Sequence, residues 1–463
     1  MAVDYDLVIL GGTQVGYEAA CHAAQLGART ALVLQGLEGR RSPLKTLGAL
    51  WTNRSPFLVS PSENAAATWQ WAIQRATLIA DKLTSNDFQQ LMMQGVDVIA
   101  ESGQLVRDRP LQVTTPSRQL SSRSLLLATG SRPCLPTIPG LEAVSYETPE
   151  TFLHRETLPQ SVAVLGSAPT ALTLCQTLCR WGVTTILITP TDALLSREDP
   201  DVARWITGQL RAEGAQLRLG QTVQTIAAND TMLSLCLADE TIQVEALVVA
   251  TKTRPNLMGT NLETFLDCDR GFTVNAYLQT QNPRIYACGA VLGGYEMPAI
   301  ARQEALIAVE NALFWHRRRI DYGTLPYDLP TQPAMARVGL TEPQARRRYS
   351  ETDLYICRQS LYDNPKAQWL ESTTGFCKLI AHRNGQILGA HGVGPDANEW
   401  VQTMAWLMSQ KTPWTAIANH PTLPHSLNDI LRQTAQQWKR DRWQPGQWRR
   451  DWAENWFNWR RSR

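Results

Sequence analysis

The chain has 463 residues, with 44 basic and 42 acidic side chains and a formal net charge of +2. This balance excludes a global bias toward nucleic acid, and no apolar run approaches the ~20 residues that span a bilayer. Nine cysteines are scattered without a C-x-x-C pair or a metal-type spacing with histidine, so we expect buried reduced thiols and no metal site. The first residues lack the pattern of a secretory leader, and we expect a cytoplasmic protein.

The first 35 residues have the pattern of a strand, a glycine turn, a helix and a second strand. An apolar run at 7–10 ends at Gly11-Gly12, an alanine-rich segment with helical spacing follows at 19–26, and a second apolar run occupies 31–34. A helix N-terminus at such a turn offers free amides and a positive dipole end to a pyrophosphate. The pattern predicts a dinucleotide site; the alternative is a turn that only connects strand to helix.

The glycine motif of this turn is incomplete. Gly11 and Gly16 match the first and third glycines of G-x-G-x-x-G, whereas Thr13 stands at the second, where we expect its side chain to occupy space near the phosphates. The second strand ends in Leu34 and Gln35 instead of an acidic residue. An amide at position 35 would hold a ribose hydroxyl more weakly than a carboxylate.

Further regular elements follow along the chain, and they include a second copy of the strand, turn and helix pattern. Helices are expected at about 62–83 (capped by Ser62), 86–94 (capped by Asn86), 299–314, 398–409 and 426–435, and strands at 96–100, 105, 111–114, 125–127, 246–250, 376–381 and 387–393. We interpret the strands at 96–114 as a small meander. The strand at 125–127 leads into Ala128-Thr129-Gly130.

The second copy of the pattern begins at residue 161. Gly166 is retained, while Ala168 and Ala171 occupy the other two glycine positions. Neither an acid for a ribose hydroxyl nor an arginine for a 2′-phosphate ends the following strand. This segment predicts a second dinucleotide site, weakened by the methyl group of Ala168.

The composition changes from Gln436, where six tryptophans are interleaved with basic residues. Pro445-Gly446 divides this segment, and four of the tryptophans then follow one stripe of a helix: Trp448, Trp452, Trp456 and Trp459. The stripe predicts a helix that binds a membrane surface or an acidic protein partner through residues 438–463. The alternative is that the rings pack back on the domain. Nucleic acid is not expected, because no RNA-binding module accompanies these residues.

The order of these motifs resembles the class I pyridine nucleotide-disulfide oxidoreductases, the family of dihydrolipoamide dehydrogenase, glutathione reductase and mercuric reductase. The resemblance covers nearly the whole length. Its segments include LGGTQVGYEAA (10–20), LLLATGSRP (125–133), VAVLGSAPTA (162–171), NPRIYACGAV (282–291) and HPTLPHSL (420–427). It implies an α/β fold with two Rossmann-like dinucleotide-binding domains and a C-terminal α+β interface domain that forms a homodimer.

The resemblance also implies domain boundaries, cofactors and binding residues. We expect a discontinuous FAD-type domain (1–150 and 256–325), an NAD(P)-type domain (151–255), an interface domain (326–435) and a Trp/Arg-rich tail (436–463). The implied cofactors are FAD and NAD(P). The implied cofactor-binding residues are Gly11, Gly12, Thr13, Gly16, Gln35, Ala128, Thr129, Gly130, Gly166, Ala168, Gly289 and Ala290.

The family mechanism passes a hydride from NAD(P)H to FAD and then to a cysteine pair just after the first strand-helix-strand unit. Here no cysteine lies between Cys21 and Cys134, and the region that should carry the pair reads LGALWTNRSPFLV (47–59). Dithiol chemistry of the family type is therefore excluded on composition. The family's flavin-binding acid also falls at Ala290.

The family's catalytic histidine matches His420, whereas the glutamate that orients it falls at His425. Two imidazoles can hydrogen-bond, but His425 lacks the fixed negative charge that raises basicity. Both histidines are candidate catalytic residues. The alternative for His420-Pro421 is a retained interface turn.

Two functions agree with these features. The first is an FAD-dependent oxidoreductase without disulfide chemistry, which passes electrons from NAD(P)H through FAD to a non-disulfide acceptor. The second is a catalytically inactive, cofactor-poor homodimeric scaffold, which binds a partner or lies peripherally on a membrane through its tail.

Overall fold

The structure is a computed structural model of two compact units. The first comprises Met1–Asp192 and Leu210–Asp321, and the second comprises Ala193–Gln209 and Tyr322–Arg463. The described residues are 3–36, 65–83, 88–108, 111–229, 231–264, 272–294, 297–423, 425–443, 446 and 448–463. The expected caps Ser62 and Asn86 and the segment 47–59 lie outside them. The domain boundaries given above stay a prediction.

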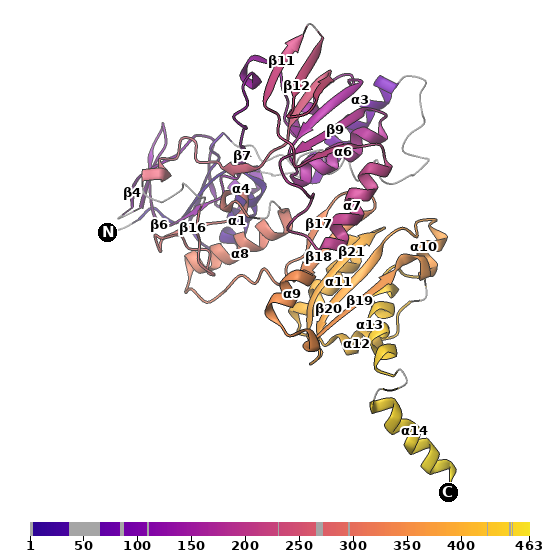
Figure 1. Cartoon of the computed structure of the whole chain (residues 1–463). Helices are drawn as coiled ribbons and strands as arrows, with labels where there is room; N and C mark the ends of the chain where they lie inside the picture. Colours follow the sequence, from indigo (N-terminus) through magenta and orange to yellow (C-terminus); the bar gives the residue numbers. More distant parts are fainter. Residues whose placement is uncertain are drawn as a thin grey trace. The chain divides into compact units, whose positions relative to one another are not determined.

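A seven-stranded sheet organises the first unit, with the strand order β3-β2-β1-β6-β5-β4 and β16 paired to β6 (Figure 1). Its strands are β1 (Tyr5–Leu10), β2 (Thr30–Val33), β3 (Asp97–Ile99), β4 (Gln104–Asp108), β5 (Leu111–Thr114), β6 (Gln119–Leu127) and β16 (Ile285–Ala287). Leu10 pairs in parallel with both Val33 and Leu127, so the carboxyl ends of these central strands share one edge.

The strand predicted at 96–100 does not belong to a meander. It forms β3, which pairs in parallel with β2, whereas the antiparallel meander consists of β4, β5 and β6. β3 follows helices α3 (Ala65–Leu83) and α4 (Phe88–Met93), and a strand that returns through a helical crossover pairs in parallel.

Two helices cover one face of this sheet, namely α1 (Gln14–Gln25) and α8 (Pro298–Leu313). Half of their buried residues are alanines, namely Ala19, Ala20 and Ala23 on α1 and Ala301, Ala305 and Ala308 on α8. Spacings of three and four place these small side chains on one face of each helix. The helices therefore lie close to the sheet and position the turn that precedes α1.

A smaller parallel sheet with the order β10-β9-β8-β14 carries the second strand, turn and helix. In chain order, the strands and helices from 149 to 249 are α5 (Pro149–Phe152), β8 (Ser161–Leu165), α6 (Pro169–Arg180), β9 (Thr184–Thr189), α7 (Pro200–Ala212), β10 (Gln216–Leu219), β11 (Thr225–Asn229), β12 (Met232–Cys236), β13 (Thr241–Val244) and β14 (Ala246–Val249), and most of α7 belongs to the second unit. β11, β12 and β13 form a separate antiparallel sheet, and β7 (Ser131–Pro133) pairs with β15 (Thr253–Pro255).

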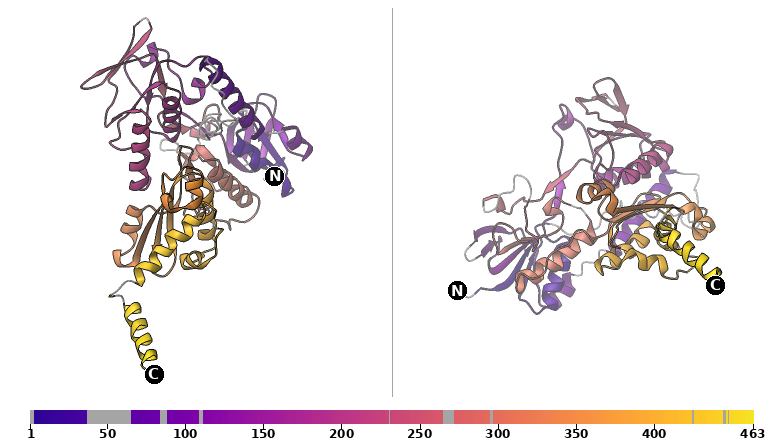
Figure 2. Two further views of the ribbon diagram at one scale, coloured as in Figure 1. Left: turned by 90° about the vertical axis from the view of Figure 1, so that its right-hand side faces the viewer. Right: turned by 60° about the horizontal axis from the view of Figure 1, so that its bottom comes forward.

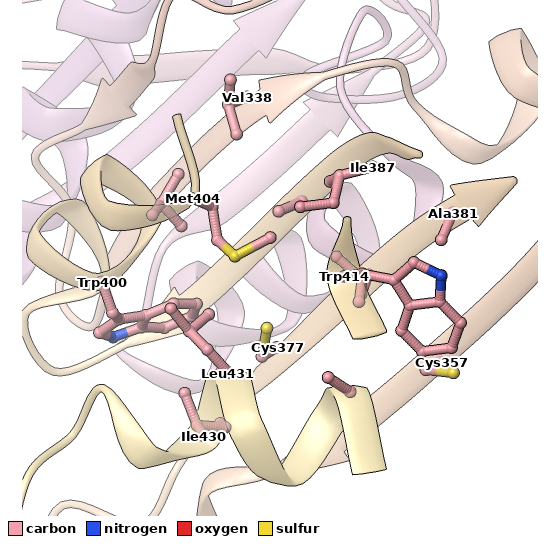
Figure 3. Close-up of a cluster of buried hydrophobic side chains, with 14 of the residues drawn as sticks. Val338, Cys357, Cys377, Ala381, Ile387, Trp400, Met404, Trp414, Ile430 and Leu431 are labelled. Carbon is pink, nitrogen blue, oxygen red and sulfur yellow. The ribbon is translucent and has the colours of Figure 1, made fainter. Parts of the chain in front are cut away.

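The second unit is built on an antiparallel sheet with the order β17-β18-β21-β20-β19 (Figure 2). Its elements are β17 (Tyr327–Leu329), β18 (Ala334–Gly339), α9 (Glu342–Arg348), β19 (Leu354–Ser360), α10 (Pro365–Trp369), β20 (Phe376–His382), β21 (Ile387–Gly394), α11 (Ala397–Ser409), α12 (Trp414–Asn419), α13 (Asp429–Arg442) and α14 (Trp448–Arg461). Figure 3 shows Trp400, Met404, Trp414 and Leu431 around Cys377, so helices α11, α12 and α13 pack on one face of the sheet.

Helix α13 extends into the segment predicted as the tail. Residues 436–442 continue helix α13, and Trp438 is 7% exposed, with its ring centroid 4.0 Å from that of Trp414. Trp438 is therefore a core residue, because its ring completes the aromatic cluster over the sheet. The helix predicted for the four-tryptophan stripe is confirmed as α14.

A buried ion cluster joins the start of α7 to the sheet within the second unit. The Lys378 side chain is 3% exposed, and its Nζ lies 2.8 Å from both Asp199 Oδ1 and Asp201 Oδ2 and 2.6 Å from Glu342 Oε2. Burial opposes the charge of this ammonium, but hydrogen bonds to the three carboxylates outweigh burial and raise its pKa. Removing the lysine would leave the fully buried Asp199 carboxylate without its cation.

We predict that Lys378→Met lowers the free energy of unfolding by about 3–5 kcal/mol at neutral pH, because it leaves buried charges unpaired. Burial opposes ionisation of Asp201 and Glu342, but hydrogen bonds from Lys378 hold the pKa of both carboxyl groups below the usual range. The stability that these ion pairs contribute is fully present above the ordinary pKa values of the two carboxyl groups. It is lost as the pH falls through their lowered pKa values in the folded protein.

The difference between wild type and Lys378→Met should therefore shrink in acid, as measured by urea unfolding at neutral pH and below about pH 4. The exposed Lys411 provides the control, and Lys411→Met should stay within about 0.5 kcal/mol of wild type. Equal losses for the two variants would contradict the role of the cluster.

Candidate functional site

Three segments predicted to bind the first cofactor meet at the carboxyl edge of the large sheet. They are the turn after β1, the Ala128-Thr129-Gly130 segment after β6 and the Gly289-Ala290 segment after β16. The Ala128 amide donates to Leu10 O at 2.8 Å, and the Cys288 amide donates to Leu127 O at 3.0 Å. An edge of this kind, beside the first strand of an open parallel sheet, is where nucleotides bind in such folds.

Glycine is required at two positions of the turn after β1. Gly11 has φ +119°, and a Cβ there would lie 2.3 Å from the carbonyl oxygen of Ala128. A Cβ at Gly16 would lie 1.9 Å from the carbonyl oxygen of Gly11. These glycines therefore let the turn approach both the end of β6 and the first turn of α1.

Thr13 caps helix α1. Its Oγ1 accepts a hydrogen bond from the Gly16 amide at 3.2 Å and donates to Ala128 O at 2.8 Å. The prediction that the Thr13 side chain obstructs the phosphates does not take these two bonds into account. They direct its hydroxyl toward the backbone. Among the described residues no acceptor is recorded for the amides of residues 13–15, which leaves three donors at a helix N-terminus.

One buried hydroxyl at this edge has no partner within the described chain. Thr129 is 2% exposed, and its Oγ1 has no hydrogen bond, while Asn256 Nδ2 donates to the Thr129 carbonyl at 3.4 Å. The Oε1 atom of Gln14 is also buried without a donor. Leaving such a group unsatisfied costs about 1–3 kcal/mol, so these atoms indicate where a polar ligand group would fit.

Gln35 does not offer its amide to a ribose. Its backbone has φ +59°, and its Nε2 donates to Gly103 O at 2.7 Å. The neighbouring Leu34 is 7% exposed and belongs to the apolar core. The predicted weak ribose contact is therefore replaced by a bond inside the protein.

A buried glutamate missed in the sequence occupies the amide of Gly289. Glu304 on α8 is 5% exposed, and its Oε2 accepts from the Gly289 amide at 2.6 Å. This amide is thus unavailable to a ligand, contrary to the role expected for Gly289. The sequence feature that could have indicated its burial is the position of Glu304 near Ala301 and Ala305, on the apolar face of a predicted helix.

The second glycine turn offers fewer donors. Gly166 has φ +120°, and a Cβ there would lie 2.3 Å from the carbonyl oxygen of Ala250 at the end of β14. Ala168 is the N-cap of α6 without a side-chain cap, and Pro169 removes one amide from the first turn. The turn keeps the geometry of the first site with a poorer set of hydrogen-bond donors.

The structure does not bring His420 and His425 together. His420 lines a cavity of about 370 Å³ with Asn419, Asp429 and Arg432, while the His425 ring stacks on Trp369 with centroids 4.3 Å apart. No hydrogen bond between the two imidazoles occurs in the part of the chain that is described. In place of a bond to His420, the His425 ring contacts the indole of Trp369.

Comparison with known proteins gives the family. Residues 5–305 match the family described as pyridine nucleotide-disulphide oxidoreductase, and residues 326–429 match the dimerisation domain of that family. The chain belongs to the pyridine nucleotide-disulphide oxidoreductase family. Its members are FAD-binding flavoproteins that use NAD(P)H, and the dimerisation domain indicates a homodimer. None of the described helices is long and apolar enough to cross a membrane.

Individual relatives cover most of the chain. It is 31% identical over 416 residues to a mercuric reductase of Staphylococcus aureus, covering 86% of this chain and 75% of that protein. It is 29% identical over 468 residues to a dihydrolipoyl dehydrogenase of Bacillus subtilis, covering 93% and 98%. The predicted family is therefore confirmed.

Solved structures show the same fold. The HOCl-induced flavoprotein disulfide reductase RclA of Escherichia coli, in its Cu(II) complex, superposes with a TM-score of 0.82 at 23% identity, covering 94% of this chain and 100% of that one. LpdA of Mycobacterium tuberculosis superposes with a TM-score of 0.83 at 23% identity, covering 93% and 99%. The predicted fold, two dinucleotide-binding domains and a C-terminal dimerisation domain, is confirmed.

We predict that Thr13→Ala lowers the free energy of unfolding by about 1 kcal/mol, because the helix loses its N-cap. Thr13→Ser keeps the hydroxyl and should lie closer to wild type. Urea unfolding of the cofactor-free protein measures both. Equal stability of the alanine and serine variants would show that the hydroxyl does not cap α1.

Proposed function

We propose that this protein is an FAD-dependent oxidoreductase that accepts electrons from NAD(P)H and passes them to an acceptor other than a disulfide, such as a quinone or a small redox protein. The observation that carries the proposal has two parts. The backbone of the turn after β1 has the close approach at Gly11 and Gly16 that suits a dinucleotide, and the chain has no cysteine between Cys21 and Cys134. Family membership supports the flavin, and the lack of cysteine in that segment supports an acceptor other than a disulfide.

The residues at the carboxyl edge of the large sheet fit FAD. The amides of residues 13–15 and the positive end of α1 would hold the pyrophosphate, and the unpartnered Thr129 hydroxyl would bond to a polar group of the cofactor. When bound, FAD supplies two-electron redox chemistry. Gly11, Gly12, Gly16, Ala128 and Gly130 shape the backbone around it. Gln35, Gly289 and Ala290 contribute less, because Gln35 and Gly289 bond within the protein.

Several of the described cysteines are poor candidates for a substitute dithiol. Burial raises the pKa of Cys377 to about 12 and that of Cys288 well above the ordinary value. A hydrogen bond to Cys179, together with burial, raises the pKa of Cys175. Because the thiolate is the reactive form, these thiols stay protonated and inert near neutral pH.

Binding of the electron donor NAD(P)H and the transfer of protons are assigned to two other parts of the chain. Gly166 and Ala168 shape the turn proposed for NAD(P), where few amides are free. His420 is the stronger candidate for proton transfer, because it faces a cavity, whereas His425 is stacked on Trp369.

The first experiment is an absorption spectrum of the purified protein, with flavin released by denaturation and counted per chain. We expect about one flavin per chain, bleaching by NADH or NADPH, and dye reduction that thiol alkylation leaves unchanged. A colourless protein that takes up no added FAD would refute the proposal. Bound flavin that neither nicotinamide bleaches would refute its donor half.

The Thr129 hydroxyl gives a sharper test. We predict that Thr129→Val weakens FAD binding about fivefold and leaves the cofactor-free protein equally or more stable, because an unpaired buried hydroxyl is removed. The control is Thr260→Val, since the buried Thr260 Oγ1 donates to Leu257 O at 2.7 Å. That variant should lose stability by about 1 kcal/mol and keep its affinity for FAD. The opposite pattern would assign Thr129 a structural role.

The second candidate function is a catalytically inactive, cofactor-poor homodimeric scaffold that binds an acidic protein or a membrane surface through its tail. The exposed tryptophans of α14 favour it. Because Trp438 is a core residue, the chain must be truncated after Trp443. Loss of recruitment from an intact dimer would support the scaffold, and unchanged recruitment would contradict it.

A further inference from the structure

Helix α14 presents an aromatic face that the described chain leaves exposed. Trp448, Trp452, Trp456 and Trp459 are 70%, 62%, 44% and 44% exposed. Their spacing of three and four places them on one face. Three of the rings contact one another, with centroids of Trp452 and Trp456 6.0 Å apart and those of Trp456 and Trp459 5.1 Å apart. The four rings thus form an aromatic stripe along one face of the helix.

The residue types of this face fit a bilayer interface better than a protein core. The helix reads WRRDWAENWFNWRR and contains no leucine, isoleucine, valine or methionine. Seams between helices are filled by such aliphatic side chains, which interdigitate as knobs and holes. Tryptophan is instead enriched at the headgroup level of membranes, where its ring is buried and its N–H stays hydrated.

The charges of the helix complement an anionic surface. Helix α14 carries four arginines and two acidic residues, and Arg463 follows it. Arg449 lies over the ring of Trp448 at 5.2 Å, and Arg463 lies over that of Trp459 at 4.1 Å. Guanidinium groups beside the aromatic stripe can bind lipid phosphates while the rings enter the interface.

The length of the helix sets how it can bind. Its 14 residues extend about 21 Å, which is shorter than the ~30 Å hydrocarbon core of a bilayer. It cannot span the membrane and would lie in the plane of the interface, as amphipathic helices do.

We propose that α14 docks this protein on an anionic phospholipid surface, with the four tryptophans inserted at the headgroup level and the arginines bound to lipid phosphates. The inference rests on the tail contact of the second candidate function and names its partner. It also holds for a flavoprotein, since docking would bring the first candidate's redox centre to an acceptor dissolved in the membrane.

The test is co-flotation of the full-length protein with vesicles of phosphatidylcholine, alone or mixed with phosphatidylglycerol. We expect binding to the mixed vesicles, weakened by added salt, and at least tenfold weaker binding to phosphatidylcholine alone. Arg449→Gln/Arg460→Gln should weaken binding to the mixed vesicles about fivefold per arginine. Binding that ignores both lipid charge and these arginines would overturn the proposal.

The aromatic part is tested with a matched pair of variants. Trp452→Ala/Trp456→Ala should reduce vesicle binding at least tenfold, whereas Trp406→Ala on α11, a ring that is 63% exposed, should leave it unchanged. Light scattering without lipid tests whether a second copy of the chain covers α14 instead. If the double variant instead breaks a larger oligomer and does not alter flotation, a second copy covers the helix and the proposal is wrong.

Flavin content of the same samples separates this inference from the redox proposal. A colourless protein that takes up no added FAD but floats with anionic vesicles supports docking and refutes the redox function. A flavin-containing protein that does not float refutes docking alone, as does an acidic protein partner that binds α14 while vesicles do not.

Discussion

The carboxyl edge of the large sheet, where we propose that FAD binds, depends on one close backbone contact. This contact joins the turn after β1 to the end of β6. At Gly11 a single added carbon would lie 2.3 Å from the Ala128 carbonyl oxygen, and at Gly16 it would lie 1.9 Å from the Gly11 carbonyl oxygen. This approach lets Thr13 bond to Ala128 and to the Gly16 amide at once. The amides of residues 13–15 and the Thr129 hydroxyl, which have no partner among the described residues, then face the same edge. The site is therefore defined by the backbone more than by side chains.

Side chains near this edge have been recruited into the protein's own hydrogen bonds. Gln35 bonds to Gly103, and Glu304 bonds to Gly289, so two groups that could face a ligand instead stabilise loops and the start of a helical turn. Binding through backbone donors and one hydroxyl is weaker per contact than binding through carboxylates, but it needs no particular side chain at most positions.

Tryptophan has two different roles in the second unit. Trp400 and Trp414 are 1% and 0% exposed and fill the core between the sheet and its helices, with Trp438 packed against Trp414. The tryptophans of α14 remain exposed and are spaced along one helical face. The buried cluster of Lys378 with three carboxylates fixes the start of α7 on the sheet. The second unit therefore has a packed aromatic core and ends in a helix whose tryptophans are exposed.

The sequence by itself determined the family, the glycine turns, the lack of any cysteine between Cys21 and Cys134 and the helix of the aromatic stripe, because these depend on local spacing and composition. Only the tertiary structure decided what each polar side chain does. Thr13, Gln35 and Glu304 find partners that are distant in the chain, β3 pairs with β2 through a crossover, and Trp438 joins the core instead of the tail. These contacts depend on which strands and helices pack together in the folded protein. The order of residues within one segment does not specify that packing.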